Sequence, residues 1–179
     1  MKDLLDAIRE IVIEVAIREN IYLSGIIEKG IFWMPEVAFV SSVWKELLLY
    51  SRIHKEHDFE WKMEKKIGST VGPVDLVGFQ ENEPKIAIEF KMGGTSDSYI
   101  IDIQKLQKIS ADVHGNITTV FCALIDPYED EAGSDPRVSM MADMDNIEII
   151  KNYHEFQTAY DRIKSVSCKI GLWNVLKAR

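Results

Sequence analysis

The residues best suited to chemistry lie in two short runs, 72–79 and 85–92. Asp75 is in the first run, and Glu89 and Lys91 are two residues apart in the second. Two carboxylates at one point repel each other and favour a divalent cation between them, and Mg²⁺ takes oxygen ligands while keeping waters that serve as nucleophile. A lysine beside that ion orients the water, helps to deprotonate it or offsets charge developing on a phosphate. The three residues therefore predict hydrolysis of a phosphodiester.

Two antiparallel strands would position these residues, because both runs are rich in β-branched and aromatic residues and are bounded by Gly and Pro. We expect a polar five-residue connection, 80–84, between them. Side chains alternate faces along a strand, so Glu89 and Lys91 should share a face with Ala87, about 6 to 7 Å from each other. The opposite face would be apolar: Ile86, Ile88, Phe90 and Met92. Glu-x-Lys also occurs on ordinary half-exposed strands, but Asp is depleted in strands, and Asp75 therefore favours the functional interpretation.

The sequence Asp75, then Glu89-Phe90-Lys91 on the next strand, resembles the PD-(D/E)XK nuclease superfamily over residues 35–126. One position departs from that pattern, because Val74 separates Pro73 from Asp75 where the family has Pro directly before the Asp. The resemblance implies an α/β restriction-endonuclease-like core of a helix, a three-strand meander, a second helix and a fourth strand. It also implies Mg²⁺-dependent cleavage of nucleic acid. DNA is the expected substrate, and Mn²⁺ should be able to replace Mg²⁺. Asp75 and Glu89 would hold the metal, and Lys91 would handle the water.

Glu36 is a candidate third metal ligand and catalytic residue. It follows Pro35, a residue that helices favour in their first turn, and a carboxylate there suits the positive end of the helix dipole. The apolar stripe of the predicted helix, which runs to about residue 53, leads back from Phe39 and Val40 to Glu36. Two alternatives remain open: Glu36 faces solvent, or it reaches the metal site as a helix-borne Glu does in some members of the resembled family.

A second helix is predicted for residues 98–113, with 95–97 offering N-cap residues after Gly93-Gly94. It begins beside Lys91, and the resembled family often carries polar residues on this helix. The run Asp102-Ile103-Gln104-Lys105-Leu106 is similar to that family pattern in its polar residues. We choose Gln104 as a residue that assists catalysis. The alternative is a plain amphipathic helix.

Four lysines are candidates for contacts with nucleic-acid phosphates: Lys62, Lys65, Lys105 and Lys108. The first two lie in a run, 59–67, in which Glu and Lys alternate with apolar residues, and this pattern predicts the first strand of the meander. Alternating charges are also typical of a solvated strand face. Both interpretations stay open for these side chains.

The composition predicts one globular domain. The chain has 179 residues, of which 46% are hydrophobic. We expect an N-terminal helical extension (1–34), the core (35–126) and a C-terminal part (127–179) that extends and covers the sheet. No run approaches the ~18 apolar residues that a membrane span needs, and the N-terminus does not read as a signal peptide, so a cytoplasmic protein is expected. Cys122 and Cys168 lie in apolar runs and are expected to be reduced core residues.

The net charge of −8 opposes binding to a polyanion. Most of the surplus falls in residues 126–148, where eight acids stand against Arg137 alone. The field near a site matters more to a phosphate backbone than the total charge, so a nuclease with salt-sensitive affinity remains compatible with this composition. The alternative is a catalytically inactive member of the fold, acting as a nucleic-acid or protein interaction module, with the 126–148 region docking a basic protein. A homodimer would suit a double-strand cut.

The remaining segments are predicted from periodicity and from turn residues. Residues 2–18 should form a helix that ends at 20–25, while 26–33 is compatible with a helical turn or an extended segment. A buried strand, 117–125, should follow the second core helix and pair in parallel through a crossover. The C-terminal predictions are a short helix at 138–141, a strand at 147–150, a helix at 153–163 and a strand at 166–173. Nucleophile-elbow, phosphate-loop and His-Glu-x-x-His motifs are absent from the sequence.

Overall fold

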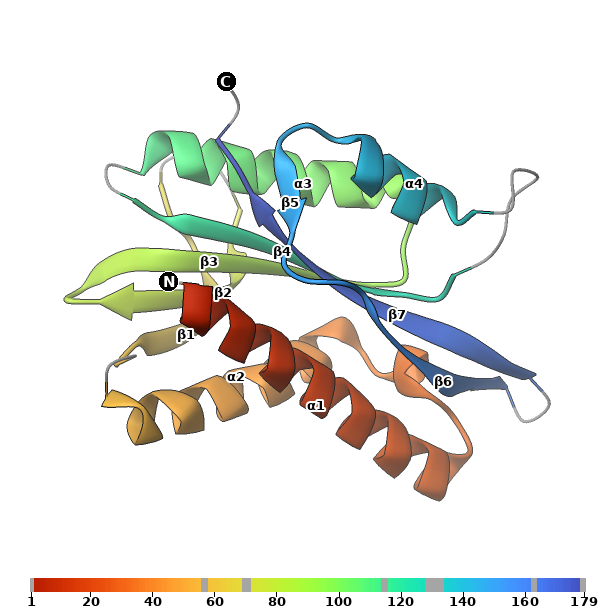
Figure 1. Cartoon of the computed structure of the whole chain (residues 1–179). Helices are drawn as coiled ribbons and strands as arrows, with labels where there is room; N and C mark the ends of the chain where they lie inside the picture. Colours follow the sequence, from red (N-terminus) through yellow and green to blue (C-terminus); the bar gives the residue numbers. More distant parts are fainter. Residues whose placement is uncertain are drawn as a thin grey trace.

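A computed structural model describes residues 2–55, 58–68, 72–113, 116–127, 134–161 and 164–177. In this part of the chain, seven strands form one mixed, mostly antiparallel sheet in the order β1-β2-β3-β4-β7-β5, with β6 pairing along the other half of β7 (Figure 1). The strands are β1 (Glu60–Lys65), β2 (Val74–Gln80), β3 (Glu83–Met92), β4 (Thr118–Ile125), β5 (Ile147–Ile149), β6 (His154–Asp161) and β7 (Lys164–Val175). The protein is therefore of the mixed α/β class.

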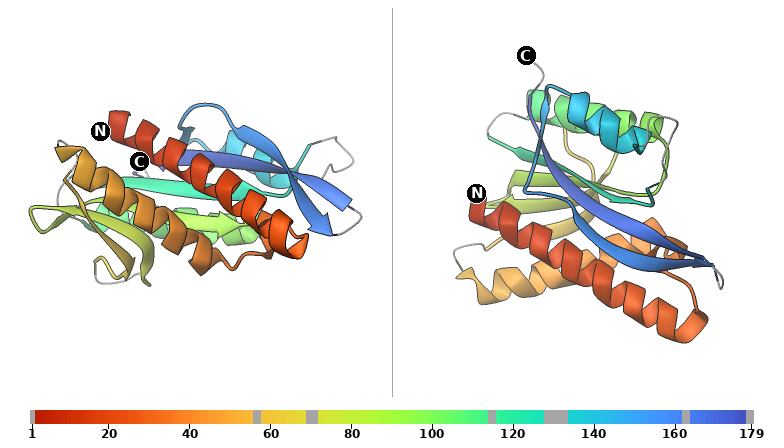
Figure 2. Two further views of the ribbon diagram at one scale, coloured as in Figure 1. Left: turned by 90° about the horizontal axis from the view of Figure 1, so that it is seen from below. Right: turned by 45° about the vertical axis from the view of Figure 1, so that its right-hand side comes forward.

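Helices cover both faces of the sheet (Figure 2). They are α1 (Lys2–Ile27), the short 3₁₀ helix η1 (Ile31–Trp33), α2 (Glu36–Ile53), α3 (Ser96–Asp112) and α4 (Pro136–Asp143). α1 and α2 bury their apolar stripes against Ile86, Ile88 and Phe90 of β3, whereas α3 and α4 pack on the face that carries Ala87. The alternation predicted for β3 is confirmed, and Glu89 and Lys91 share the α3 side of the strand with Ala87.

The elements around β3 follow the predicted order. α2, the antiparallel strands β1, β2 and β3, then α3 and β4 succeed one another, and β4 pairs with β3 in parallel. Gly93 and Gly94, both at positive φ, turn the chain from β3 into α3. Thr95 caps α3 through its side chain, which accepts a hydrogen bond from the backbone N–H of Ser98. The Ser98 hydroxyl in turn accepts a hydrogen bond from the backbone N–H of Thr95. The start of α3 is thereby fixed close to the end of β3.

The connection between β2 and β3 is shorter than predicted. The strands extend through Gln80 and from Glu83, leaving Glu81 and Asn82 as a two-residue turn. Both turn residues have positive φ, 53° and 65°, as the twist of a tight hairpin requires. Asn is suited to that conformation, whereas Glu is not, and for this reason the sequence pointed to a longer loop.

One predicted helix end and one predicted element type are wrong. α1 continues to Ile27 through Gly25, because the Asn20 and Ser24 side chains bond to the segment that follows the helix: Asn20 accepts from the Ile31 N–H, and Ser24 donates to the Lys29 carbonyl. The segment 153–163, predicted as a helix, contains strand β6, which forms a hairpin with β7. Long-range pairing with β7 overrides the local helical pattern.

None of the helices in the described ranges is both long enough and apolar enough to traverse a bilayer. Cys122 and Cys168 are buried free thiols in the core, as predicted.

Candidate active site

Asp75 and Glu89 are brought together by the register of β2 and β3. Leu76 lies opposite Ile88, so Asp75 and Glu89 occupy the next position along the ladder. The backbone N–H of Phe90 donates to Oδ2 of Asp75 at 2.8 Å. This bond holds one Asp75 oxygen against the backbone of β3.

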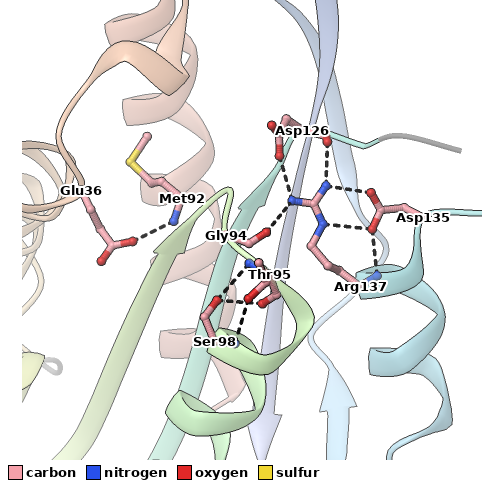
Figure 3. Close-up of polar contacts among 8 residues, drawn as sticks. All are labelled: Glu36, Met92, Gly94, Thr95, Ser98, Asp126, Asp135 and Arg137. Atoms are coloured by element: carbon pink, nitrogen blue, oxygen red, sulfur yellow. Dashed lines mark hydrogen bonds and ion pairs between the residues drawn. The ribbon is translucent and has the colours of Figure 1, made fainter. Parts of the chain in front are cut away.

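Glu36 points toward β3 and does not simply face solvent, whereas its predicted role as a metal ligand stays a prediction. Its Oε2 accepts a hydrogen bond of 2.9 Å from the backbone N–H of Met92 (Figure 3). Its Oε1 lies 3.8 Å from Nζ of Lys91. The first turn of α2 thus contributes a half-buried carboxylate to the end of β3 that carries Glu89 and Lys91.

Lys91 lies between the two helical layers. Its ammonium contacts Oδ2 of Asp102 on α3 at 3.0 Å, opposite the longer contact to Glu36 on α2. Burial by itself would lower the pKa of Lys91, but the contact with Asp102 and the charges of Glu36 and Asp75 together outweigh it, and the pKa is raised. Lys91 therefore remains protonated at neutral pH and acts as a fixed positive charge.

Lys105, one turn beyond Asp102 on α3, meets the carboxylates from the other side. Its Nζ lies 2.6 Å from Oε1 of Glu89 and also donates to the Pro73 carbonyl at the start of β2. The side chains of Lys105 and Glu89 are only 18% and 4% exposed, so this ion pair is shielded from water. Lys105 was predicted as a phosphate contact, and in this structure its ammonium is engaged inside the site.

The three carboxylates predicted as metal ligands all have raised pKa values. For Glu89 the pKa is raised to about 8, first by burial and then by the charge of Asp75, against the lowering effect of Lys105. Burial also raises the pKa of Asp75 and of Glu36, each opposed by a backbone N–H bond. The site therefore resists carrying all of its negative charges at once.

The numbers of carboxylates and ammoniums in the site explain why its carboxylates resist full ionisation. When every group is ionised, the four carboxylates Glu36, Asp75, Glu89 and Asp102 face the two ammoniums of Lys91 and Lys105, which leaves a surplus of two negative charges. One divalent cation would neutralise that surplus, and carboxylate oxygens are the ligands that Mg²⁺ prefers. In donor chemistry and in charge, the residues fit the ion that the sequence predicted.

As the side chains stand, no three His, Cys, Asp or Glu residues in the described ranges are grouped closely enough to hold a metal ion. One oxygen of Asp75 and one of Glu36 are bonded to backbone N–H groups, and one of Glu89 contacts Lys105. The metal site therefore stays a prediction. A cavity of about 150 Å³ opens beside these carboxylates, and its lining is Glu36, Val37, Val40, Met63, Glu64 and Asp75.

Asp102 is the functional candidate that the sequence interpretation did not select. It lies on the helix chosen for polar residues, three positions from Lys105, so both side chains extend from one side of α3. Gln104, chosen instead, is exposed, and the helical repeat turns it away from the Asp102 side. The spacing of Asp102 and Lys105 was a usable signal, because residues three apart share a helix face.

The other predicted phosphate contacts lie at the surface. Lys62 on β1 pairs with Glu60 at 3.0 Å and its ammonium lies over the ring of Phe79, while Lys65 and Lys108 are exposed. Their role with nucleic acid stays a prediction.

The acidic region 126–148 is partly structural. Asp126 and Asp135 both bind Arg137, which is 2% exposed (Figure 3). Residues 128–133 of this region lie outside the described residues.

Comparison of the chain with protein-family models, with curated proteins and with solved structures gives no match. The function must therefore be argued from the geometry above.

Proposed function

We propose that this protein is a Mg²⁺-dependent nuclease of the PD-(D/E)XK type, which hydrolyses phosphodiester bonds in nucleic acid, with DNA as the first substrate to test. The observation that supports the proposal best is the meeting of Asp75 and Glu89 from neighbouring strands with Glu36 from α2 and Lys91 beside them. These groups come from separate parts of the chain. Their convergence supports a common task.

Asp75 and Glu89, with Glu36, would hold Mg²⁺ through the carboxylate oxygens that no backbone N–H occupies. The ion, when bound, supplies positive charge for the phosphate and lowers the pKa of a water molecule. Lys91 is the second source of charge. Because its pKa is raised, it donates a hydrogen bond to the attacking water or to a phosphate oxygen and does not act as the base.

Glu36 and Asp102 position Lys91 from its two sides, and this arrangement fixes the ammonium relative to β3. Surface lysines, Lys62, Lys65 and Lys108, would meet the phosphate backbone. With a net charge of −8, binding of DNA in the cytoplasm should depend strongly on salt or on a second subunit that adds basic surface. Two copies of the chain would supply the two sites of a double-strand cut.

A non-catalytic interaction module is the second candidate. It is favoured by the ion pair of Lys105 with Glu89, which compensates the buried charge without a metal. Such a module, docking a basic protein through the acidic 126–148 region, should take up no Mn²⁺ that depends on Asp75 and Glu89. Titration with Mn²⁺ therefore separates the two candidates.

The test of the proposed function is cleavage of plasmid and end-labelled oligonucleotides by the full chain with Mg²⁺, Mn²⁺ or EDTA. Asp75→Asn and Lys91→Met should each lower the cleavage rate at least ~100-fold, because each removes charge that stabilises the transition state. Lys85→Met is a matched control on the same strand, paired with the exposed Glu83, and should cut at the wild-type rate. Equal cleavage by the wild type and Asp75→Asn would refute the assignment.

A further inference from the structure

The ammonium of Lys105 contacts two oxygen atoms at the candidate active site. It contacts Oε1 of Glu89 at 2.6 Å and donates to the carbonyl of Pro73, and its charge lowers the pKa of Asp75. Both Glu89 and Asp75 are expected metal ligands. The position of Lys105 is therefore one in which a small cation would also be stabilised.

The two lysines of the site have different partners. Lys91 is paired with Asp102 and lies at 3.8 Å from Glu36, so it compensates carboxylates on the two helices. Lys105 compensates the strand carboxylates, Glu89 directly and Asp75 through space. Of these two lysines, Lys105 makes the closer contact to a proposed metal ligand, at 2.6 Å from Glu89 against 3.8 Å from Lys91 to Glu36.

We propose that Lys105 is an internal competitor of the metal: its ammonium stabilises Glu89 in the metal-free protein and has to release that carboxylate when Mg²⁺ binds. This inference rests on the proposed function, because it describes the control of the same site. A lysine and a divalent ion cannot both contact one carboxylate oxygen closely without strong repulsion. The competition sets the metal affinity below the value that the carboxylates alone would give.

The fold allows the ammonium to leave while α3 stays in place. α3 is anchored by Tyr99, Ile103 and Leu106, which are fully buried. Lysine carries its charge on a flexible four-carbon stem, so the ammonium can swing outward without movement of the helix. Outside the site, a phosphate of the substrate would be a new partner for it.

The experiment measures binding of Mn²⁺ to the full chain without nucleic acid, by isothermal titration calorimetry and by electron paramagnetic resonance of free Mn²⁺. Lys105→Met removes the charge and keeps the apolar stem, and it should bind Mn²⁺ about tenfold more tightly than the wild type, since the repulsion between two cations is lost. Lys105→Arg keeps the cation and should bind no more tightly than the wild type. Lys85→Met, at the start of β3 and paired with the exposed Glu83, is the control and should stay within about twofold of the wild type.

Lys105→Gln is a second neutral variant in case Lys105→Met does not fold, because its amide still donates hydrogen bonds. Unchanged or weaker binding by the neutral variants, with binding lost in Asp75→Asn, overturns the inference and leaves the proposed function standing. No binding of Mn²⁺ by any of the proteins, neutral variants included, overturns both. Binding by the neutral variants alone supports the competition most directly.

Discussion

Two ionic clusters lie near the end of β3, and their charges are compensated to different degrees. Figure 3 shows the Arg137 cluster and, from the candidate active site, Glu36. Among the described residues, the Arg137 guanidinium donates two hydrogen bonds to Asp135, two to Asp126 and one to the Gly94 carbonyl. A guanidinium has five N–H donors, so all of them are used. In the candidate active site, by contrast, two lysine ammoniums face four carboxyl groups, and burial together with the charge of Asp75 raises the pKa of Glu89 to about 8.

The difference indicates that the Arg137 cluster stabilises the fold, whereas the Glu36–Asp75–Glu89 group is suited to chemistry. The Arg137 cluster ties α4 to the end of β4 and to the turn that leads into α3, and Asp135 also caps α4 by accepting from the Arg137 N–H. Its charges therefore stabilise the fold. The Glu36–Asp75–Glu89 group keeps a surplus of charge that folding alone would not require, and perturbed carboxylates of this kind are typical of functional sites.

The largest effect is expected when the satisfied cluster is broken. Arg137→Met should lower the free energy of unfolding by about 3 to 5 kcal/mol, because it removes the guanidinium that pairs with the buried carboxylate of Asp135. Urea unfolding followed by circular dichroism measures the change. Arg52→Met, at an exposed position of α2, is the control and should change stability by no more than about 0.5 kcal/mol. A loss below about 1 kcal/mol in Arg137→Met would contradict the structural role of this cluster.

In the candidate active site, a substitution is expected to raise the free energy of unfolding. The raised pKa of Glu89 means that its contribution to stability is fully present below the unfolded value of 4.5 and is lost as the pH rises toward about 8. Glu89→Gln removes this loss, so at pH 8.5 and without metal the variant should be more stable than the wild type, by about 2 to 4 kcal/mol. At pH 4 the two proteins should differ little.

Urea titrations at pH 4, 6, 7 and 8.5 measure this difference, and Glu83→Gln on the exposed end of the same strand is the control. Glu89→Gln should also abolish nucleic-acid cleavage. A stability gain that does not grow with pH would rule out the raised pKa as its cause. If Glu89→Gln is less stable than the wild type at pH 8.5, the Glu89 carboxylate stabilises the fold, as the Asp135 carboxylate does.

The smallest change in stability, about 1 kcal/mol or less, is expected for Asp102→Asn, because the pair with Lys91 is partly exposed and Glu36 remains nearby. Cleavage should fall about tenfold, since Lys91 loses the partner that orients it and raises its pKa. Asp97→Asn, exposed in the first turn of α3, is the matched control. If the pH profile of cleavage is unchanged in Asp102→Asn and the rate equals that of the control, Asp102 does not position Lys91.

Much of the site was predictable from strand geometry. The two-residue period of β3 places Glu89 and Lys91 on one face, and the apolar stripe of α2 leads back to Glu36. Both inferences depend only on neighbours in the sequence. The pairing of Lys105 with Glu89 and of Asp102 with Lys91 depends on how α3 is rotated over the sheet, which a pattern within one helix does not specify.

The misassigned C-terminal segment has the same origin. Residues 153–163 carry a pattern that is compatible with a helix, and the pairing with β7 decides that His154–Asp161 is a strand. Arg137 is a similar case, because the sequence displayed it as one basic residue in an acidic run, without indicating that it is buried among its partners.

The sequence by itself determined the strands and helices around β3, the face of Glu89 and Lys91, and the kinds of atoms available for chemistry, because these follow from local periodicity and residue type. The tertiary structure decided which charges meet: Glu36 with Lys91, Lys105 with Glu89, and Arg137 with two aspartates. Electrostatic energies depend on distance and on burial, and both are set by packing between segments that are far apart in the chain.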